Sequence, residues 1–491
     1  MHTNSNTYLE NKKMILVLGG TTEGRIAVQT LEEAGKPFYY STKGYEQDIP
    51  LHNGIRLQGG MDKDAMESFC RKENISLLID AAHPFAEELH RNVNDVSDKL
   101  QIPAILYDRI YPRIEKHDGI VWCDSFEDAV QKIKKEEVYI LLALTGVKSI
   151  GKLKALWQES CRCYFRILDR ESSRELARSE AFPEEYLRYY HAGEDERLLI
   201  RQIRPDAIVI KESGASGGFS EKVEAAQELG IRIFIIKRPP LQPNLLPVNG
   251  RHGLRRMVEL YHPGFYDLRS GFTTGTCAAA AAAAAIWDIF NLDGTPRPPE
   301  FIVTLPNGEM IGVPVEPQKQ RPRSSSVNDN WMVESEACVI KDAGDDPDIT
   351  NGMQIKVNIA LPFNMDEVNS GKQQDDYNII IAGGEGIGIV TMPGLGLEAP
   401  AINPTPRKMI EENVRMYLSY VGVPKMSNPI VVTISVPGGE EIAKRTFNPR
   451  LGIEGGLSII GTSGIVKPFS SEAFVSSIRK SMEVARATDS P

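Results

Sequence analysis

Short apolar runs alternate with amphipathic stretches from residue 14 to residue 260, and this alternation limits the fold more than any other feature of the chain. MILVLGG at 14–20 is typical of a buried strand, and the stretch that ends at Gly35 is typical of a helix. The strand pattern returns in PFYYST, SLLIDAA and PAILYDR, and starts afresh with VYILLALTG, CYFRIL, DAIVIKESG and IRIFIIKRPP. Such alternation predicts βαβ units around parallel sheets. We therefore expect two α/β lobes, divided near residues 120–137.

The sequence pattern of alternating strands and helices ends after Pro239. A Pro-rich stretch and a short helical segment, GLRRMVELY, lead into strands such as EFIVTLP, MQIKVNIAL, YNIIIAG and PIVVTISV, which are typical of an α+β domain. The segment 316–330, rich in Pro, Ser and Arg, is predicted to be an exposed loop. We expect a disordered lead-in at 1–13, a two-lobed α/β domain at 14–262 and an α+β domain at 263–491.

Composition excludes several classes of protein. The net charge of −10 argues against a general nucleic-acid binder, and no run approaches the ~20 apolar residues that span a bilayer. The polar N-terminus has no secretion signal, so we expect a cytoplasmic protein. The six cysteines include no CxxC pair, which favours reduced thiols and no protein metal site. Cys161 and Cys163 are expected on opposite faces of a strand. The oligomeric state stays open.

A glycine loop joins the first predicted strand to the first helix. Glycines allow close approach of a ligand, and a helix N-terminus offers free N–H groups to a phosphate. The spacing differs from G-x-G-x-x-G, so either a dinucleotide phosphate site or a tight turn is compatible with it. Ser41-Thr42-Lys43 lacks the acid expected to bind a ribose, which leaves NADH and NADPH both open. The candidate cofactor-binding residues are Gly19, Gly20, Thr21, Thr22, Glu23, Gly24 and Arg25.

Two further strand ends carry candidate groups. His83 follows SLLID. Because ligands of open α/β sheets bind beyond the carboxyl ends of strands, His83 is well placed for binding or proton transfer. The alternative is that it caps the next helix. The loop at 211–218, with Lys222 one turn into the next helix, is compatible with an anion site or with a flexible turn. We expect this loop and the one at 19–25 to be half-sites that face one cleft.

LVLGGTTEGR, IDAAHPFA, KESGASGGFSEKVEAAQELGI and the closing Lys237-Arg238-Pro239 together resemble the precorrin-6A reductase family, of the CbiJ type. The departures are Ala82 for Thr and Glu212 for Asp. The resemblance implies two Rossmann-like lobes, NADH or NADPH as cofactor, and hydride transfer to a macrocycle double bond, with His83 as the candidate catalytic group. It also implies basic and loop residues that hold the carboxylates of a cobalt-precorrin. Besides Arg25, the candidates are Arg109, Lys148, Lys211, Ser213, Gly214, Lys222 and Arg238.

The second half has its own motifs. Thr273 and Thr274 precede a run of alanines at 278–285, which predicts a closely packed helix. The two threonines are predicted as an N-cap and an anion site, and they are candidate substrate contacts. Cys277 there is expected to be a buried structural thiol. The acids at 342–348 favour turns, caps or polar contacts over a metal. Gly383, Gly384, Glu385 and Gly386, then glycines at 394 and 396, indicate backbone close to a ligand. Arg407 and Arg450 lie in two further loops and are candidate substrate contacts.

LRSGFTTGTCAAAA, KDAGDDPDITNG, GGEGIGIVTMPGLGL, PAINPTPRKMI and NPRLGIEGGLSIIGTSGIVKP together resemble the cobalt-precorrin-5B C1-methyltransferase family, of the CbiD type. This family differs from the Rossmann methyltransferases, and it implies S-adenosylmethionine as the methyl donor. The family continues beyond the last of these motifs, so we expect a C-terminally truncated domain. The two resemblances imply a bifunctional enzyme of corrin-ring (cobalamin) biosynthesis. The alternatives are an active reductase with a binding or docking module, and a non-catalytic tetrapyrrole carrier.

Overall fold

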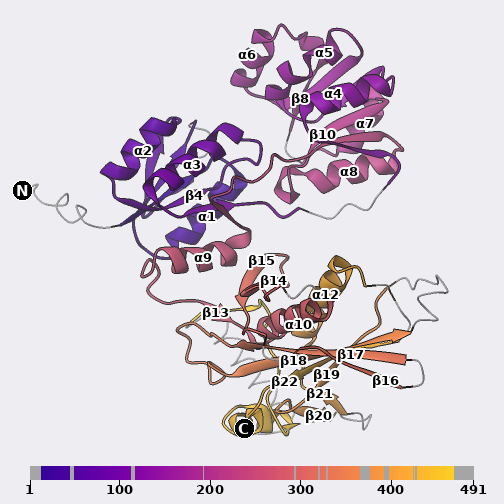
Figure 1. The fold of residues 1–491 in the computed structure, drawn as a ribbon. Helices are drawn as coiled ribbons and strands as arrows, with labels where there is room; N and C mark the ends of the chain where they lie inside the picture. The colour runs from indigo at the N-terminus through magenta and orange to yellow at the C-terminus, as the bar shows by residue number, and fades with distance from the viewer. Residues whose placement is uncertain are drawn as a thin grey trace, which may run out of the picture. The chain divides into compact units, whose positions relative to one another are not determined.

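The computed structural model describes residues 13–44, 49–111, 117–191, 193–291, 295–318, 321–327, 330–364, 376–391, 398–423, 425 and 428–468. The chain divides into two compact units, Met1–Pro247 and Val248–Pro491. Figure 1 labels their elements. Most of the expected lead-in and the whole segment after 468 lie outside the described residues. Within the described part, no helix has the length and apolar character to cross a membrane.

The first sheet of the first unit has the strand order β12-β5-β4-β1-β2-β3. Its core pairs β1–β2, β2–β3, β1–β4 and β4–β5 are all parallel, as the alternating pattern predicted. Because β1 and β4 are neighbours, the strand order reverses between them, and this is the switch point where α/β sheets bind ligands. The elements are β1 (Met14–Leu18), α1 (Thr22–Glu32), β2 (Phe38–Thr42), β3 (Gly54–Gln58), α2 (Lys63–Lys72), β4 (Ile75–Asp80), α3 (Glu87–Leu100), β5 (Ala104–Tyr107) and β12 (Leu245–Val248).

The second sheet of this unit has the order β6-β11-β10-β7-β8-β9, is parallel throughout, and has its switch point between β7 and β10. The chain passes between the sheets after Tyr107 and before Ile120, ahead of the expected 120–137. The strands are β6 (Ile120–Cys123), β7 (Ile140–Ala143), β8 (Arg162–Leu168), β9 (Leu187–Tyr190), β10 (Ala207–Lys211) and β11 (Arg232–Ile236). The helices are α4 (Phe126–Lys135), η1 (Val147–Ser149), η2 (Gly151–Leu153), α5 (Lys154–Trp157), α6 (Glu171–Ser179), η3 (Glu184–Tyr186), α7 (Glu196–Ile203), η4 (Ala215–Gly217) and α8 (Phe219–Glu228).

The cysteines depart from one prediction. All six are free thiols. Cys161 and Cys163 do not point to opposite faces, because their Sγ atoms lie 3.3 Å apart. Strand β8 begins at Arg162, so Cys161 lies before the strand and the alternation of a strand does not govern its direction.

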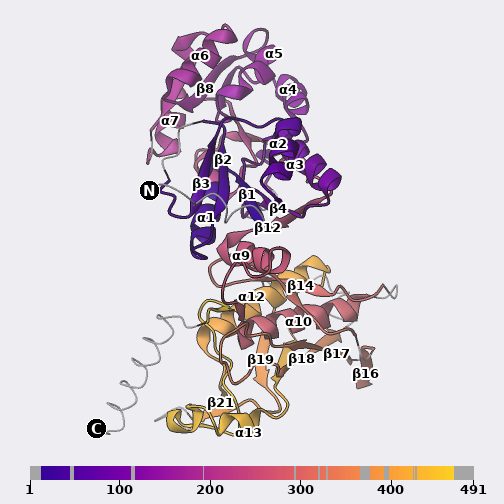
Figure 2. The ribbon, with the colours of Figure 1, turned by 90° about the vertical axis from the view of Figure 1, so that its left-hand side faces the viewer.

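The second unit is built on a five-stranded sheet, β16-β17-β18-β22-β19, with α10 and α12 on one of its sides (Figures 1 and 2). All eight alanines of the predicted helix are buried, because α10 packs against β17, β18 and α12. The elements are α9 (Gly250–Tyr261), β13 (Gly271–Phe272), α10 (Thr274–Phe290), β14 (Glu300–Thr304), β15 (Met310–Pro314), β16 (Arg323–Val327), β17 (Asn330–Ile340), β18 (Gln354–Asn364), β19 (Ile379–Gly383), β20 (Ile389–Thr391), β21 (Glu398–Pro400), α12 (Pro404–Tyr420), β22 (Ile430–Ser435), α13 (Gly439–Ala443), η5 (Asn448–Leu451), β23 (Ile453–Glu454) and β24 (Ile465–Val466).

The segment expected to be a loop at 316–330 contains a strand. β16 pairs antiparallel with β17, with Arg323 opposite Glu334 and Ser324 opposite Val333. The sequence RSSSV has no apolar alternation of its own, so its strand structure comes from pairing at the edge of the sheet.

Candidate functional site

Loops singled out from the sequence follow the central strands of both sheets in the first unit. β1 leads into the glycine loop at 19–25, and β4 leads into the segment that contains His83. In the second sheet, β7 leads into the segment before η1, and β10 leads into the loop at 211–218. These strands flank the two switch points, where α/β folds bind ligands.

A buried ionic clamp joins the two lobes of the first unit. Glu23, in the first turn of α1, accepts a hydrogen bond from Arg109 Nη2 at 2.9 Å and another from the hydroxyl of Ser216. Arg109 Nη1 donates to the carbonyl of Ser213 at 2.7 Å. Burial by itself raises the pKa of Glu23, but the Ser216 and Arg109 interactions outweigh it and bring the pKa below its ordinary value. The two predicted half-sites are therefore in direct contact, and the Glu23 carboxylate is engaged by protein groups.

His83 is a neutral imidazole in this arrangement. Its Nδ1 accepts the backbone N–H of Phe85 at 3.2 Å, which leaves the ring proton on Nε2. Burial, followed by the charges of Arg109 and Lys211, lowers the pKa of His83 to about 3. At neutral pH His83 can donate a hydrogen bond, but it carries no imidazolium proton to transfer.

Two groups that the sequence analysis missed hold the His83 segment in place. His90 Nδ1 lies 2.6 Å from the buried carboxylate of Asp80, and His90 Nε2 lies 3.0 Å from the carbonyl of His83. Burial alone lowers the pKa of His90, but the Asp80 carboxylate reverses this effect and raises it. The available signal was an acid at the end of β4 followed by two histidines in DAAHPFAEELH.

Lys211, at the end of β10, lies between aromatic rings. Its Nζ is 5.1 Å from the ring centroid of Phe85 and 5.5 Å from that of Phe126. Lys152 Nζ lies 4.7 Å from the Phe126 centroid. An ammonium over an aromatic face is attracted by the ring quadrupole. Phe85, Phe126 and Lys152 were not among the sequence candidates, because they come from three separate segments.

Other lysines surround Lys211. Burial, then repulsion from Lys152, Lys148 and Lys222, lowers the pKa of Lys211 to about 8. Within the described ranges, no hydrogen-bond acceptor or carboxylate pairs with Lys211 Nζ. Lys148 is exposed, whereas Lys222 Nζ donates to a backbone carbonyl at 2.8 Å. The lobe therefore presents an excess of positive charge close to His83.

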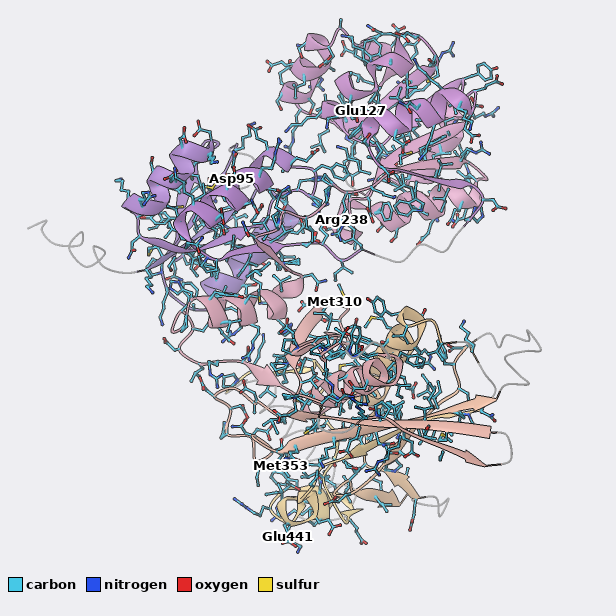
Figure 3. All side chains as sticks on the ribbon, in the orientation of Figure 1. Asp95, Glu127, Arg238, Met310, Met353 and Glu441 are labelled. Atoms are coloured by element: carbon cyan, nitrogen blue, oxygen red, sulfur yellow. The ribbon has the colours of Figure 1, made fainter. Side chains whose placement is uncertain are left out.

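A pocket of about 130 Å³ lies where β5 ends. Arg109 contributes to its wall, and the Nε of Arg109 is buried without a hydrogen-bond partner among the described residues. Arg238, labelled in Figure 3, also lines the pocket; it pairs with Asp108 and lies 4.0 Å over the ring of Tyr111. The predicted contacts Arg109 and Arg238 thus already have protein partners for part of their guanidinium groups.

The remaining residues of the first glycine loop shape the start of α1. Gly20 has a φ of +108°, and no atom lies within 4 Å of the place where a Cβ would be. Thr21 caps the helix by accepting the N–H of Gly24 at 3.2 Å. A Cβ at Gly19 would lie 2.5 Å from the ring of Tyr40, so this glycine is required by packing. Thr22 and Arg25 are exposed, and Ser213 and Gly214 are buried beside Arg109.

In the second unit, motifs that are far apart in sequence meet along residues 457–464. Leu457 exchanges backbone hydrogen bonds with Gly386 and Gly388, at 2.8 and 2.9 Å. The N–H of Thr273 donates to the carbonyl of Gly464 at 3.1 Å. The motifs that carried the second resemblance therefore form one connected region.

Protein packing accounts for the glycines at 383–386. A Cβ on Gly386 would lie 2.0 Å from the carbonyl oxygen of Val436, and one on Gly456 would lie 2.4 Å from the carbonyl oxygen of Gly386. A Cβ on Gly384 would lie 2.3 Å from a serine hydroxyl, and one on Gly383 would lie 2.9 Å from a proline ring. The expected close approach is thus to neighbouring backbone and side chains. Glu385 is exposed, and the glycines at 394 and 396 lie outside the described residues.

Protein groups also occupy both predicted threonines of the second unit. The hydroxyl of Thr273 caps α10, and that of Thr274 donates to the carbonyl of Ile460 at 3.1 Å. Arg407 Nη1 donates to a carbonyl of β19 at 3.4 Å, whereas Arg450 is exposed. Of the four predicted contacts, Arg450 has the most exposed side chain.

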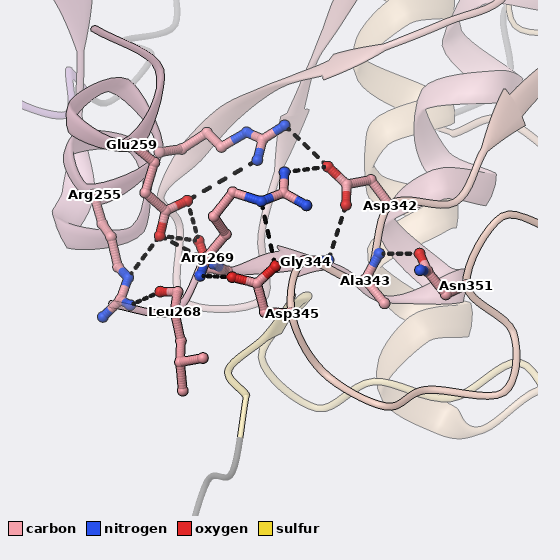
Figure 4. Close-up of polar contacts among 11 residues, drawn as sticks. Arg255, Glu259, Leu268, Arg269, Asp342, Ala343, Gly344, Asp345 and Asn351 are labelled. Atoms are coloured by element: carbon pink, nitrogen blue, oxygen red, sulfur yellow. Dashed lines mark hydrogen bonds and ion pairs between the residues drawn. The ribbon is translucent and has the colours of Figure 1, made fainter. Parts of the chain in front are cut away.

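Three of the acids at 342–348 pair with basic side chains of the same unit: Asp342, Asp345 and Asp348. Figure 4 shows the first two. Asp342 lies 3.3 Å from Arg256 and 3.4 Å from Arg269, and Asp345 accepts the backbone N–H of Arg269 at 2.7 Å. No group of three or more potential metal ligands occurs among the described residues. These pairs attach the segment between α9 and α10 to the loop after β17.

The fold and the clamp define a two-lobed α/β protein with Rossmann-like strand order, joined to an α+β unit. Residues 14–258 match the family model of precorrin-6x reductase CbiJ/CobK, and residues 262–468 match that of CbiD. The chain is therefore a fusion of a CbiJ/CobK-type region with a CbiD-type region.

Two curated relatives and one solved structure are each similar to about half of this chain. A cobalt-precorrin-5B C(1)-methyltransferase of Prosthecochloris aestuarii is 43% identical over 226 residues, which cover 46% of this chain and 54% of the relative. The protein of the same name from Moorella thermoacetica is 45% identical, over 45% of this chain and 52% of the relative. A solved CobK precorrin-6A reductase is 19% identical over 51% of this chain and 98% of that chain, with a TM-score of 0.42. The chain spans about half the length of the curated relatives it matches.

Proposed function

We propose that this chain is a bifunctional enzyme of corrin-ring biosynthesis, which methylates cobalt-precorrin-5B at C1 and reduces cobalt-precorrin-6A. The observation that carries the proposal is the succession of two family matches, at 14–258 and 262–468, on one chain. The product of the methyltransferase reaction is the substrate of the reductase. Fusion of consecutive enzymes raises the local concentration of the intermediate.

For the reductase, we propose that the loop at 19–25 holds NADH or NADPH, which supplies the hydride. The open space beside Gly20, at the N-terminus of α1, supports a phosphate there, because this end of a helix attracts anions. Glu23 lies in the same turn, and its pairing with Arg109 offsets a negative charge that would otherwise repel a phosphate. Exposed Arg25 adds a cation at the start of the helix.

We propose that the lysines near His83 bind carboxylates of the macrocycle. Lys148 is exposed and has no carboxylate partner within the described ranges, and this supports the assignment. Lys211 lies near Lys148, Lys152 and Lys222 and adds to the positive charge that attracts the carboxylates. Three further basic residues already bind protein groups, so their main role would be to hold the loops of the site in place: Arg109, Arg238 and Lys222. His83, held by the Asp80–His90 pair, would orient the substrate through its Nε2–H.

For the second unit, we propose methyl transfer from S-adenosylmethionine, with the donor and the macrocycle bound near the loops that meet at 457–464. Arg407 and Arg450 are the proposed carboxylate contacts. Displacement at a sulfonium methyl by a ring carbon needs no protein nucleophile; the protein positions the reactants. Cys277 fits this account, because burial raises its pKa to about 12 and keeps it a thiol.

An anaerobic assay of the full chain with cobalt-precorrin-5B tests the proposal. With S-adenosylmethionine we expect the mass gain of one methyl group. The methylated product is the substrate of the reductase, so added NADH or NADPH should then reduce it by two hydrogens. Reduction without methylation would support a reductase joined to a binding or docking module. Macrocycle binding with neither reaction would support a tetrapyrrole carrier.

A further inference from the structure

We propose that Lys211 is the general acid that completes the reduction, by giving the proton of its ammonium group to the carbon adjacent to the one that receives the hydride. This inference rests on the proposed reductase function. The bond formed is C–H and the bond broken is N–H. The C=C bond becomes a single bond, and the reduced nicotinamide, which supplies the hydride, is oxidised. Lys211 is left as an amine and regains a proton from solvent.

The surroundings of Lys211 suit an acid more than a permanent ion pair. Within the described ranges no carboxylate neutralises its ammonium group, which lies over the rings of Phe85 and Phe126. The charged and titratable groups that face it are Lys148 and Lys152 from η1 and η2, Lys222 from α8, and His83 from the loop after β4. All the charges that act on it are positive, so loss of its proton relieves repulsion. A group with a pKa of about 8 is protonated at neutral pH and still transfers its proton readily.

The position of Lys211 supports the same role. It ends β10 at the switch point of the second sheet, and its side chain contacts Phe85 of the other lobe. Phe85 is two residues from His83 and belongs to the segment that follows the switch point of the first sheet. Lys211 therefore projects from one lobe toward the segment that we assign to substrate positioning in the other. His83 is the other nearby titratable group from the sequence analysis, but it is already deprotonated at neutral pH.

The first experiment compares Lys211→Arg with the unaltered chain in the reduction of cobalt-precorrin-6A. Arginine keeps the charge for binding a carboxylate but is a very weak acid. We expect KM to change little and kcat to fall by about 100-fold or more, the usual contribution of a general acid. In D₂O the unaltered chain should deliver deuterium to one face of the product carbon, and the variant should lose this selectivity. Unchanged kcat and selectivity would overturn the proposal.

The second experiment leaves Lys211 in place and changes its neighbour. Lys152→Met removes the largest repulsion on Lys211, so the pKa of Lys211 should rise. Lys211 can donate a proton only as the ammonium ion, so kcat of the unaltered chain should fall above about pH 8. In Lys152→Met this fall in kcat should occur at higher pH. NMR titration of ¹³C-labelled lysines in the full chain, assigned with Lys211→Arg, should show the same shift without turnover. If kcat of Lys152→Met fell at the same pH as that of the unaltered chain, this would contradict the role of Lys211 as the general acid.

The two proposals fail in different ways. Oxidation of neither NADH nor NADPH by the unaltered chain with cobalt-precorrin-6A would overturn both the reductase function and the role of Lys211. Normal oxidation by the unaltered chain, with an equally fast Lys211→Arg variant of unchanged selectivity, would overturn the role of Lys211 alone.

Discussion

At the scale of single residues, Gly20 tests where the nicotinamide cofactor binds. Gly20→Ala would place a methyl group in the open space proposed for a phosphate, at a φ of +108°. We expect the Kd for NADPH to rise by about tenfold or more, because the side chain blocks access to the helix N-terminus. Isothermal titration calorimetry measures this directly. Gly35→Ala is a matched control, since Gly35 also has a positive φ of +63° and no atom within 4 Å. An equal loss of affinity in both variants would contradict the assignment.

The pair of Glu23 and Arg109 gives a prediction about pH. The pKa of Glu23 is lowered in the folded chain, so its ionisation stabilises the fold above the ordinary pKa of about 4.5, and this contribution disappears as the pH falls through the folded value. Glu23→Gln leaves Arg109 buried without its charge partner. We expect it to cost about 3–5 kcal/mol at pH 7 and less as the pH falls through the folded pKa of Glu23.

Urea denaturation from pH 7 to pH 3 measures the effect of Glu23→Gln. Asp95→Asn is the control, because Asp95 pairs with Lys63 at an exposed site. We expect that change to cost less than about 1 kcal/mol at every pH. A Glu23→Gln penalty that does not depend on pH would mean that the charge of Glu23 has no part in the clamp.

The sequence could not have predicted this clamp. Glu23 lies 86 residues from Arg109 and 193 from Ser216, and no local pattern encodes such contacts. The glycines were predicted to bring the backbone close to a ligand, and the surroundings that the structure gives them differ from place to place. Beside Gly20 there is open space, whereas at Gly386 the close neighbour is the backbone of Val436. A glycine in a sequence indicates that something lies close or that the turn is tight, and only the fold determines which.

At the scale of elements, α10 has little room for added volume. Its alanines are buried because α12 and the sheet approach it closely. We expect Ala281→Leu to destabilise the second unit by about 1–3 kcal/mol through overpacking. Thermal denaturation followed by circular dichroism gives the measurement. Ala65→Leu on α2 is the control, because Ala65 is exposed and the change should have almost no effect there. Equal stability of the two variants would mean that the space around Ala281 can accommodate a larger side chain.

The strands also show which elements sequence patterns predict and which they do not. The central strands β1, β4, β7 and β10 were predicted because burial on both faces gives continuous apolar runs. The edge strand β6 was not recognised, because IVWC is only partly buried, and the lobe boundary was therefore placed too late. Strand β16 is polar and exists through its pairing with β17. Edge strands depend on their neighbours for structure, so their own residues carry little signal.

At the scale of the whole molecule, the division into two units predicts two unfolding transitions. Each unit has buried hydrophobic cores of its own, for example around Leu16 and Phe165 in the first and around Ala281 and Ile359 in the second. A chain with separate cores does not unfold in a single two-state step. In differential scanning calorimetry we expect Glu23→Gln to lower one transition temperature and Ala281→Leu to lower the other.

Ligands should separate the same transitions. A ligand that binds only the folded form stabilises it by about 2.7 kcal/mol at a concentration of 100 Kd. NADPH should therefore raise only the transition that Glu23→Gln lowers, and S-adenosylmethionine only the one that Ala281→Leu lowers. The expected shift is about 2–4 °C for each kcal/mol in units of this size. If both ligands raised one shared transition, the two halves would fold as one cooperative body. If S-adenosylmethionine raised neither, the second unit would not bind the methyl donor, and the bifunctional proposal would reduce to a reductase with an attached module.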